Sequence, residues 1–497
     1  MQFSNRSSNV TRFTIAHCVS QSIPFSNMAE IISPDYLVVG AGAAGMAFVD
    51  TLISSNIKAT VAIVDSYSRP GGHWTIAYPH VTLHQPSKVY GVDSRKLGDE
   101  KIDQIGMNKG FLELATGDEI VAYYSRVMKS TFLPSGRVAY YPLHNYTTEG
   151  EFESIATGKR YQVGPNTRIV DATYSKITVP AMGPPSYEVS DQVNLVTPNA
   201  LATLKRPYGA YTLVGAGKTA VDACVWLLSQ GIPPQQISWI MPRDSWFLER
   251  GTLQAPESTP NPEQQLKEKA DALMGATTSD ELFLRMETYG HAHRVNKSVK
   301  PAMIKAAIVS KPELEEIKRV ENIIRQGRVK RIDSDKVTLE QGTYRPVPDT
   351  LYIDCTATGY PYRPVVPIWK GRHITIQMVK FVQPTFSAAL LAHVEATYNS
   401  DEKKKNELCK PLPSMSKPAD WSATLLVSMQ NRLRWIEEPK ITAWLEKSRL
   451  EAPVLGPPPR DPEEAAKHNA SIPHQIRAMC DKLEEIVRND TAIAATV

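Results

Sequence analysis

The sequence is poor in cysteine, and none of its cysteines stands in a recognisable pair. The five cysteines are far apart and form no Cys-x-x-Cys motif. This spacing argues against a disulfide scaffold, a structural zinc site and a dithiol redox centre. A reducing compartment fits the pattern, so we expect a cytoplasmic protein that holds no metal ion.

Long apolar runs and an excess of one charge sign are also missing. No run approaches the length of a membrane-spanning helix. The chain has 56 basic and 52 acidic residues, a net charge of +4, and no dominant basic block. We therefore expect a soluble protein with no transmembrane segment and no nucleic-acid partner. The remaining composition, 42% hydrophobic and 22% charged over 497 residues, is typical of a globular chain with several domains.

Acidic residues are absent from the first part of the chain as far as Glu30, where Arg6 and Arg12 stand among many Ser and Asn residues. Such a composition is similar to that of a transit peptide, which leaves a mitochondrial location open. The segment has no long amphipathic pattern, and Met28 offers an alternative start directly before the fold. We therefore expect residues 1–33 to form a disordered extension, with a targeting peptide as the alternative.

A glycine-rich turn follows the first strand-like apolar run, residues 35–39. The turn and the start of the following helix consist of Gly40, Gly42, Ala43, Ala44 and Gly45. In a dinucleotide-binding turn the first glycine permits the tight bend, the second lets the backbone approach a pyrophosphate, and the third lets helix and strand pack closely. The spacing predicts such a turn, and an ordinary structural turn is the alternative.

An acidic residue stands where the same motif requires one. A second apolar run, residues 59–64, ends at Asp65. A carboxylate at this place can accept both hydroxyls of an adenosine ribose and would repel a 2′-phosphate. The first turn therefore favours FAD or NAD over NADP.

The same logic recurs in residues 208–220. A strand-like run leads into a turn and helix start made of Gly215, Gly217, Lys218, Thr219 and Ala220. The next apolar run, residues 237–242, ends in Arg243 in place of an acid, and a guanidinium there can hold a 2′-phosphate. Lys218 adds a second positive charge near that phosphate or the pyrophosphate. We therefore predict FAD at the first turn and NADPH at the second, with Arg243 as a mere surface charge as the alternative.

The segments around the second turn indicate an inserted domain. Short β-rich runs at 136–142, 161–163 and 167–173 predict a small sheet that joins two halves, and residues 261–325 look mainly helical. Strand-like runs return between 327 and 354. The tail is rich in proline and ends in an amphipathic helix, whose apolar stripe we interpret as packing surface. That stripe consists of Ile476, Met479, Leu483 and Ile486.

We therefore expect an α/β protein with two Rossmann-like dinucleotide-binding domains, the NADPH domain inserted in a discontinuous FAD domain. The expected parts are an extension at 1–33, the FAD-binding domain at 34–205 and 339–400, the NADPH-binding domain with a helical insertion at 206–338, and a helical, Pro-rich C-terminal extension at 401–497.

Two such turns, with an Ala-Thr-Gly motif that ends in Thr358 and Gly359, resemble the class B flavin-dependent monooxygenases, which include the Baeyer–Villiger, flavin-containing and N-hydroxylating enzymes. The resemblance covers roughly residues 34–400. It implies a substrate cleft between the two domains. It also implies that Thr358 and Gly359 belong to the segment that connects them.

Further segments carry the resemblance. The Gly-Gly-His-Trp turn is similar to a family turn beside the flavin, which implies that Gly72, His73 and Trp74 are flavin contacts. The segment from Tyr78 onward is similar to a Tyr-Pro segment whose sixth following residue stands near the reactive edge of the flavin; here that residue is His84, where the Baeyer–Villiger enzymes have Asp. The Arg243 segment is similar to the phosphate clamp. Val138 is expected to place its backbone against the adenine.

The resemblance implies a monooxygenase that takes hydride from NADPH and inserts one oxygen atom from O₂ into a small organic substrate through a flavin C4a-peroxide. Its catalytic residues would be His84, whose ordinary pKa of about 6.5 allows proton exchange near neutrality, and Arg243, which would hold NADP⁺ over the flavin. The Baeyer–Villiger fingerprint before the second turn is absent, and the first connecting motif is replaced by residues 171–174. A flavin dehydrogenase, oxidase or isomerase, and a non-catalytic flavin-binding scaffold, therefore remain alternatives.

Overall fold

The structure is a computed structural model that describes residues 28–56, 58–254, 258, 261–452 and 461–496. Most of the expected N-terminal extension, and with it the transit-peptide alternative, lies outside these residues. Its last residues are ordered: β1 (Glu30–Ile32) pairs in parallel with β7 (Arg160–Val163). The prediction of a disordered extension is therefore wrong for residues 30–32.

The first parallel sheet has the strand order β21-β22-β8-β2-β3-β4, and every neighbouring pair is parallel except β21 with β22. Strands β2 and β3 are buried along their whole length, as expected for apolar runs covered on both faces. The strands are β2 (Tyr36–Val39), β3 (Val61–Asp65), β4 (Val138–Pro142), β8 (Arg168–Asp171), β21 (Trp369–Lys370) and β22 (His373–Thr375).

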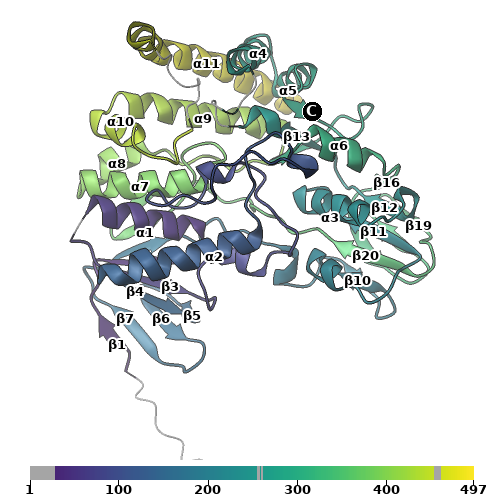
Figure 1. Ribbon diagram of the computed structural model, residues 1–497, viewed down its shortest axis with the longest axis horizontal. Coiled ribbons are helices and arrows are strands. Elements are labelled where there is room, and N and C mark those ends of the chain that lie inside the picture. Colours follow the sequence, from purple (N-terminus) through teal and green to yellow (C-terminus); the bar gives the residue numbers. More distant parts are fainter. Residues whose placement is uncertain (1–27, 57, 255–257, 259–260, 453–460, 497) are drawn as a thin grey trace, which may run out of the picture.

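Both faces of this sheet are covered. The helices that share one apolar core with it include α1 (Ala43–Ser55), α2 (Gly117–Val127) and α7 (Pro384–Tyr398). A small sheet of order β1-β7-β6-β5 packs on the other face, with β5 (His144–Tyr146) and β6 (Glu151–Ser154). The runs at 136–142 and 167–173 supply β4 and β8 of the large sheet, which corrects their prediction as part of a small joining sheet. We call this assembly the first domain (Figure 1, lower left).

The second parallel sheet has the order β10-β20-β11-β12-β16, and all its pairs are parallel. Its α3 and α6 share a core with one face, and a sheet of order β19-β18-β17-β9 packs on the other. We call this assembly the second domain (Figure 1, right). The elements are β9 (Glu188–Val189), β10 (Asn194–Val196), β11 (Ala210–Val214), α3 (Lys218–Ser229), β12 (Ile237–Ile240), α6 (Lys311–Lys318), β16 (Asn322–Ile324), β17 (Val329–Ile332), β18 (Val337–Leu339), β19 (Gly342–Tyr344) and β20 (Thr350–Asp354).

The second domain extends beyond the predicted range 206–338. Strands β9, β10 and β20 lie outside that range, yet they belong to the two sheets of this domain. The chain passes between the domains twice, and the two passages pair with each other where the N–H of Thr178 donates to the carbonyl of Gly359 at 3.1 Å. Strands this short carry little signal in the sequence, so the boundaries could not be read from it.

A helical layer lies above the first domain and ends near the edge of the second (Figure 1, top). The apolar stripe of α11 packs there against α9, α4 and α5, which confirms its interpretation as packing surface. The predicted helical insertion also contains β15, which pairs with β13 and had not been predicted as a strand. The elements are β13 (Ser245–Glu249), α4 (Pro262–Met274), α5 (Ser279–Thr288), β14 (Ala292–His293), β15 (Met303–Val309), α8 (Glu402–Leu408), α9 (Pro418–Ile436), α10 (Pro439–Leu445) and α11 (Pro462–Thr496). In the described part of the chain, no helix combines the length and the apolar character that crossing a membrane requires.

Helix α1 starts in direct contact with the end of β2. Gly40 has φ +101°, a conformation that L side chains rarely adopt, and a Cβ on Gly45 would overlap the carbonyl oxygen of Gly40. Only glycine at both positions lets the helix begin this close to the strand. The backbone geometry of the predicted first turn is thus present.

We expect Gly45→Ala to lower the free energy of unfolding by about 3 kcal/mol, since the obstructing atom is backbone and cannot move aside. Urea unfolding of the purified variant measures this. Gly183→Ala is the matched control, because a Cβ there would meet no heavy atom within 4 Å; a change at Gly45 as small as at Gly183 would contradict the close contact.

Candidate functional site

The first turn presents unsatisfied backbone donors and a buried carboxylate at one place. Gly42 caps α1, no side chain accepts from the first turn, and that turn has no acidic residue. At the end of β3, Asp65 accepts the N–H of Ala41 at 2.5 Å and the N–H of Tyr67 at 2.7 Å. Burial raises the pKa of Asp65, against the lowering effect of these two bonds. Each carboxylate oxygen retains further lone pairs for a ligand hydroxyl.

A second pair of glycines closes on this turn. Gly71 has φ +134° and donates its N–H to the carbonyl of Ala41 at 2.9 Å. Gly72 has φ +58°, and a Cβ on it would lie 3.0 Å from the Cα of Gly42. The two backbones therefore touch, and this contact brings residues 73 and 74 close to the first turn.

The aromatic side chains after Gly72 form a partly buried group. The indole N–H of Trp74 donates to the hydroxyl of Tyr90 at 2.9 Å, and the His73 ring centroid lies 5.2 Å from that of Trp74. Burial lowers the pKa of His73 to about 4, so the ring is neutral at neutral pH. These rings form an aromatic wall beside the first turn.

Val138 does not lie at this edge. It pairs with Val61 at the start of β3, whereas Asp65 pairs with Pro142. Four residues of extended strand, about 13 Å, therefore separate Val138 from the level of Asp65. The register places Pro142 at the level of the carboxylate, and the adenine contact at Val138 stays a prediction.

The second turn repeats the geometry of the first. Gly215 has φ +121°, and a Cβ on it would lie 2.7 Å from the carbonyl oxygen of Cys355. Gly217 caps α3 without any side-chain cap, and a Cβ on it would meet nothing within 4 Å. The space beside Gly217 is therefore open, and no side chain of the described residues caps the start of α3.

The neighbouring strands repeat as well. Val39 of β2 is level with Asp171 of β8, and Val214 of β11 is level with Asp354 of β20. Each aspartate accepts both the N–H and the hydroxyl of the threonine two residues further on. The two domains are thus local copies of one another around their glycine turns.

Two cations without a carboxylate partner stand at the edge of the second sheet. Arg243 is exposed, and one guanidinium nitrogen lies 3.9 Å from the sulfur of Met303. Lys305 donates to the carbonyl of Thr358 at 2.6 Å, and burial, followed by Arg243, lowers the pKa of Lys305. Among the described residues neither cation forms an ion pair. Sequence reasoning missed Lys305 because its strand, β15, had not been predicted.

Between the domains lies a group of charged side chains that we call the interdomain network: Tyr78, Lys218, Asp222, Arg250 and Glu313. The hydroxyl of Tyr78 donates to Asp222 at 2.7 Å, and Lys218 pairs with the other oxygen of Asp222. Lys218 also lies 3.4 Å from Glu313, which pairs with Arg250 at 2.6 Å. The network balances two cations with two carboxylates.

The placement of Lys218 changes its expected role. Its ammonium is neutralised by two carboxylates instead of being free for a phosphate, so the positive charge of the second site is that of Arg243 and Lys305. Its neighbour Thr219 lies beside Tyr78. Tyr78 begins the Tyr-Pro segment of the resemblance, whereas Asp222, Arg250 and Glu313 belong to no motif and could not be found from the sequence.

His84 lies within the field of this network. Burial and then Lys218 lower its pKa, which comes to about 4 because the carboxylates of the network only partly oppose these effects. His84 is therefore a neutral imidazole at neutral pH, able to donate one hydrogen bond and accept another. This corrects the expectation of proton exchange near neutrality.

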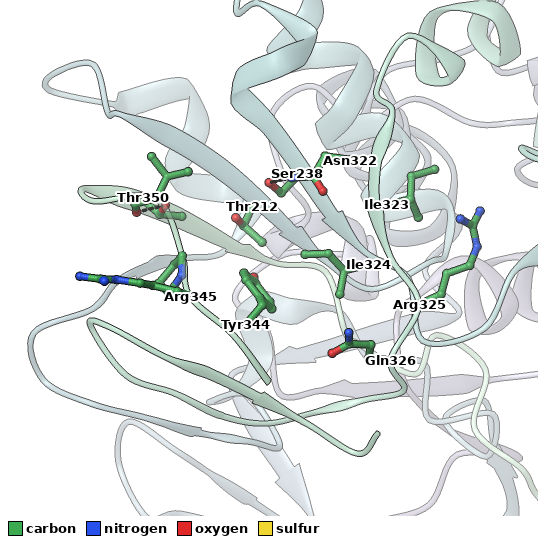
Figure 2. Close-up of a pocket in the computed structure, with 12 residues that line it drawn as sticks. Thr212, Ser238, Asn322, Ile323, Ile324, Arg325, Gln326, Tyr344, Arg345 and Thr350 are labelled. Atoms are coloured by element: carbon green, nitrogen blue, oxygen red, sulfur yellow. Dashed lines mark hydrogen bonds between the residues drawn. The ribbon is translucent and has the colours of Figure 1, made fainter. Parts of the chain in front are cut away.

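A hollow lies elsewhere, between the second sheet and the sheet of β17 to β19 (Figure 2). Its volume is about 560 Å³, and three in-register polar residues, Thr212, Ser238 and Asn322, line one wall. It lies on the sheet face opposite to α3, so it is separate from the glycine turns. Among the described residues, no group of three or more His, Cys, Asp or Glu side chains is placed to hold a metal ion.

No family model matches the chain. Two uncharacterized proteins, from Mycobacterium bovis and Mycobacterium tuberculosis, are each 43% identical over 481 residues, which is 95% of this chain and 88% of the relative. The chain therefore belongs to the family of these mycobacterial proteins.

Solved structures with a similar fold include flavoproteins. Cyclohexanone monooxygenase from Rhodococcus sp. Phi1 bound to NADP⁺ is 12% identical, with a TM-score of 0.48 over 93% of this chain and 99% of that chain. The bacillithiol disulfide reductase from Bacillus cereus is 13% identical, with a TM-score of 0.43 over 74% of this chain and 100% of that chain. At such identities the likeness concerns the fold alone.

The depressed pKa values of His73 and His84 predict acid sensitivity. The unfolded chain binds protons at both residues near pH 6.5, whereas the folded protein binds them only near pH 4, so stability falls as the pH drops through this window. We expect His84→Gln to reduce the fall in Tm between about pH 7 and about pH 5. The exposed His474, changed to Gln, is the control; an equal slope in wild type and both variants would contradict the burial of His84.

Proposed function

We propose that the protein is an FAD-dependent oxidoreductase that uses NADPH, and more specifically a monooxygenase that acts on a small organic substrate. The proposal is supported chiefly by one observation: a strand-turn-helix unit occurs twice, and the charges beside the two copies have opposite signs. One copy presents a buried carboxylate, Asp65, and the other presents two cations, Arg243 and Lys305. This difference matches the chemical difference between an adenosine ribose and a 2′-phosphorylated one.

At the first site, the free N–H groups at residues 43–45 would hold the FAD pyrophosphate in the positive field of α1. Gly40 and Gly42 let the backbone approach, and Asp65 would accept the ribose hydroxyls. Gly72, His73 and Trp74 would contact the flavin side of the cofactor. The absence of a competing side-chain cap on α1 supports this fit.

At the second site, Gly215, Gly217 and Thr219 would hold the NADPH pyrophosphate at the start of α3. The open space at Gly217 supports this fit. Arg243 and Lys305 would bind the 2′-phosphate, since a pair of cations without carboxylate partners suits a dianion. Thr358 and Gly359, in the chain passage beside Lys305, would border the same nucleotide.

Bound together, the two coenzymes would supply hydride transfer from nicotinamide to flavin and the reaction of reduced flavin with O₂. The protein would orient the two coenzymes relative to each other and would supply hydrogen bonds around the flavin. His84, kept neutral by burial, would donate a hydrogen bond beside the flavin without releasing a proton at neutral pH. The finer proposal of oxygen insertion rests on the resemblance of residues 69–74 and 78–84 to class B monooxygenases.

The decisive experiment is an anaerobic titration of the purified protein with NADPH and with NADH, followed by admission of O₂. Bleaching of bound flavin selective for NADPH supports the two-site proposal. Oxygen incorporated into a substrate supports a monooxygenase, whereas stoichiometric release of H₂O₂ with no modified product supports an oxidase. A protein that retains FAD but is not bleached by NADPH would contradict the proposed electron donor.

We expect Arg243→Ala to weaken NADP⁺ binding by about 10-fold to 100-fold, the value of a lost charge-assisted hydrogen bond. NAD⁺ binding should change little, because NAD⁺ lacks the phosphate. Calorimetric titration measures both. Arg345→Ala is the control, since Arg345 lines the hollow on the other face of the second sheet; equal weakening of both nucleotides by Arg243→Ala would contradict the clamp.

A further inference from the structure

The interdomain network contains a residue that breaks a local rule of helix structure. Lys218 is the first residue of α3, where the positive end of the helix dipole disfavours a cation. Its side chain is only 12% exposed, so it has also lost most of its hydration. A cation in this place persists because Asp222 and Glu313 neutralise it, and such conflicts between local rule and observed residue tend to mark functional positions.

Asp222 connects this helix to the first domain. One carboxylate oxygen pairs with Lys218 on the same helix, and the other accepts the hydroxyl of Tyr78 at 2.7 Å. Burial, followed by Asp222, raises the pKa of Tyr78 well above its ordinary value. Tyr78 therefore remains protonated at neutral pH and donates this bond.

Tyr78 also fixes the segment that leads to His84. Its carbonyl accepts the N–H of Val81 at 3.1 Å, and Leu83 is tied to the first domain by a bond to the carbonyl of Ala115 at 2.9 Å. The same tyrosine thus touches the helix start proposed for NADPH and begins the turn that carries the residue proposed beside the flavin.

A second contact completes the network on its far side. Glu313 caps α6 by accepting the N–H of Ser310 at 2.7 Å, and the Ser310 hydroxyl donates to the carbonyl of Met107 in the first domain at 2.8 Å. Arg250, almost fully buried, bridges Glu313 and Asn108. Lys218 is thus held between two contacts with the first domain, so neither α3 nor α6 can shift alone.

We propose that Tyr78 and Asp222 are positioning residues that dock the start of α3 onto the His84 segment and so set the orientation of the two nucleotide sites. The catalytic consequence rests on the proposed function; the docking itself does not. Because small misplacements of reacting groups slow a reaction strongly, loosening this contact should slow hydride transfer while leaving nucleotide binding, which depends on other residues, almost unchanged.

The test compares Tyr78→Phe and Asp222→Asn with two matched controls, Tyr289→Phe and Asp280→Asn, at exposed positions of α5 and its C-terminal cap. Hydrogen–deuterium exchange of the protein as purified, without added nucleotide, should rise in residues 218–222 and 76–84 of both network variants and remain unchanged in residues 36–65. Flavin reduction at saturating NADPH should slow by about 10-fold, with the NADP⁺ dissociation constant within about twofold of wild type.

Unchanged exchange in both segments would overturn the docking, whether or not the reduction rate falls. Increased exchange with an unchanged reduction rate would overturn the positioning role and leave a purely structural contact. Increased exchange in a protein whose wild type is not reduced by NADPH would uphold the docking and contradict the proposed function, so the two failures are distinguishable. Should Asp222→Asn fail to fold, Tyr78→Phe, which removes one oxygen atom and leaves Asp222 paired with Lys218, provides the same readouts.

Discussion

The structure depends on the contact between the carbonyl of Gly40 and the first turn of α1, where no side-chain atom can be accommodated. This contact sets the distance between the first sheet and the helix on it, and thereby the packing of α7 against α1. The second copy is more permissive. Ala220 stands at the third small position, where the first unit has Gly45, and it is fully buried. The two units thus differ by one methyl group at this position.

The charges follow the same duplication. In the first unit a single carboxylate is held by backbone donors and braces the glycine turn itself. In the second unit the turn is braced by the indole N–H of Trp239, which donates to the carbonyl of Gly215 at 2.6 Å, so the corresponding edge is free to carry cations. The two carboxylates of the interdomain network, Asp222 and Glu313, are matched by Lys218 and Arg250.

Much of the fold and of the candidate site was predictable because it rests on local rules. Glycine spacing fixes a turn, a buried apolar run fixes a parallel strand, and the residue that ends the next strand must lie at the same edge. Asp65 and Arg243 follow from these rules alone.

The rest depends on contacts between distant segments. Lys305 reaches Arg243 only because β15 pairs with β13, and Tyr78 reaches Asp222 across 144 positions of sequence. The separation of Val138 from Asp65 has a similar cause, because a short strand can be recognised from its composition, whereas its register against β3 depends on the whole sheet. The lowered pKa of His84 also could not be predicted, because it depends on burial by residues that are distant in sequence.

The pairing of Thr178 with Gly359 has a consequence for biogenesis. The inserted unit is continuous in sequence and its two ends meet at one hydrogen bond, so it can close upon itself as soon as residue 359 has left the ribosome. The surrounding unit must wait for β22 and α7, whose sequence comes later. Synthesis would therefore complete the second domain before the first, and β8 would remain an open edge of the first sheet until β22 follows.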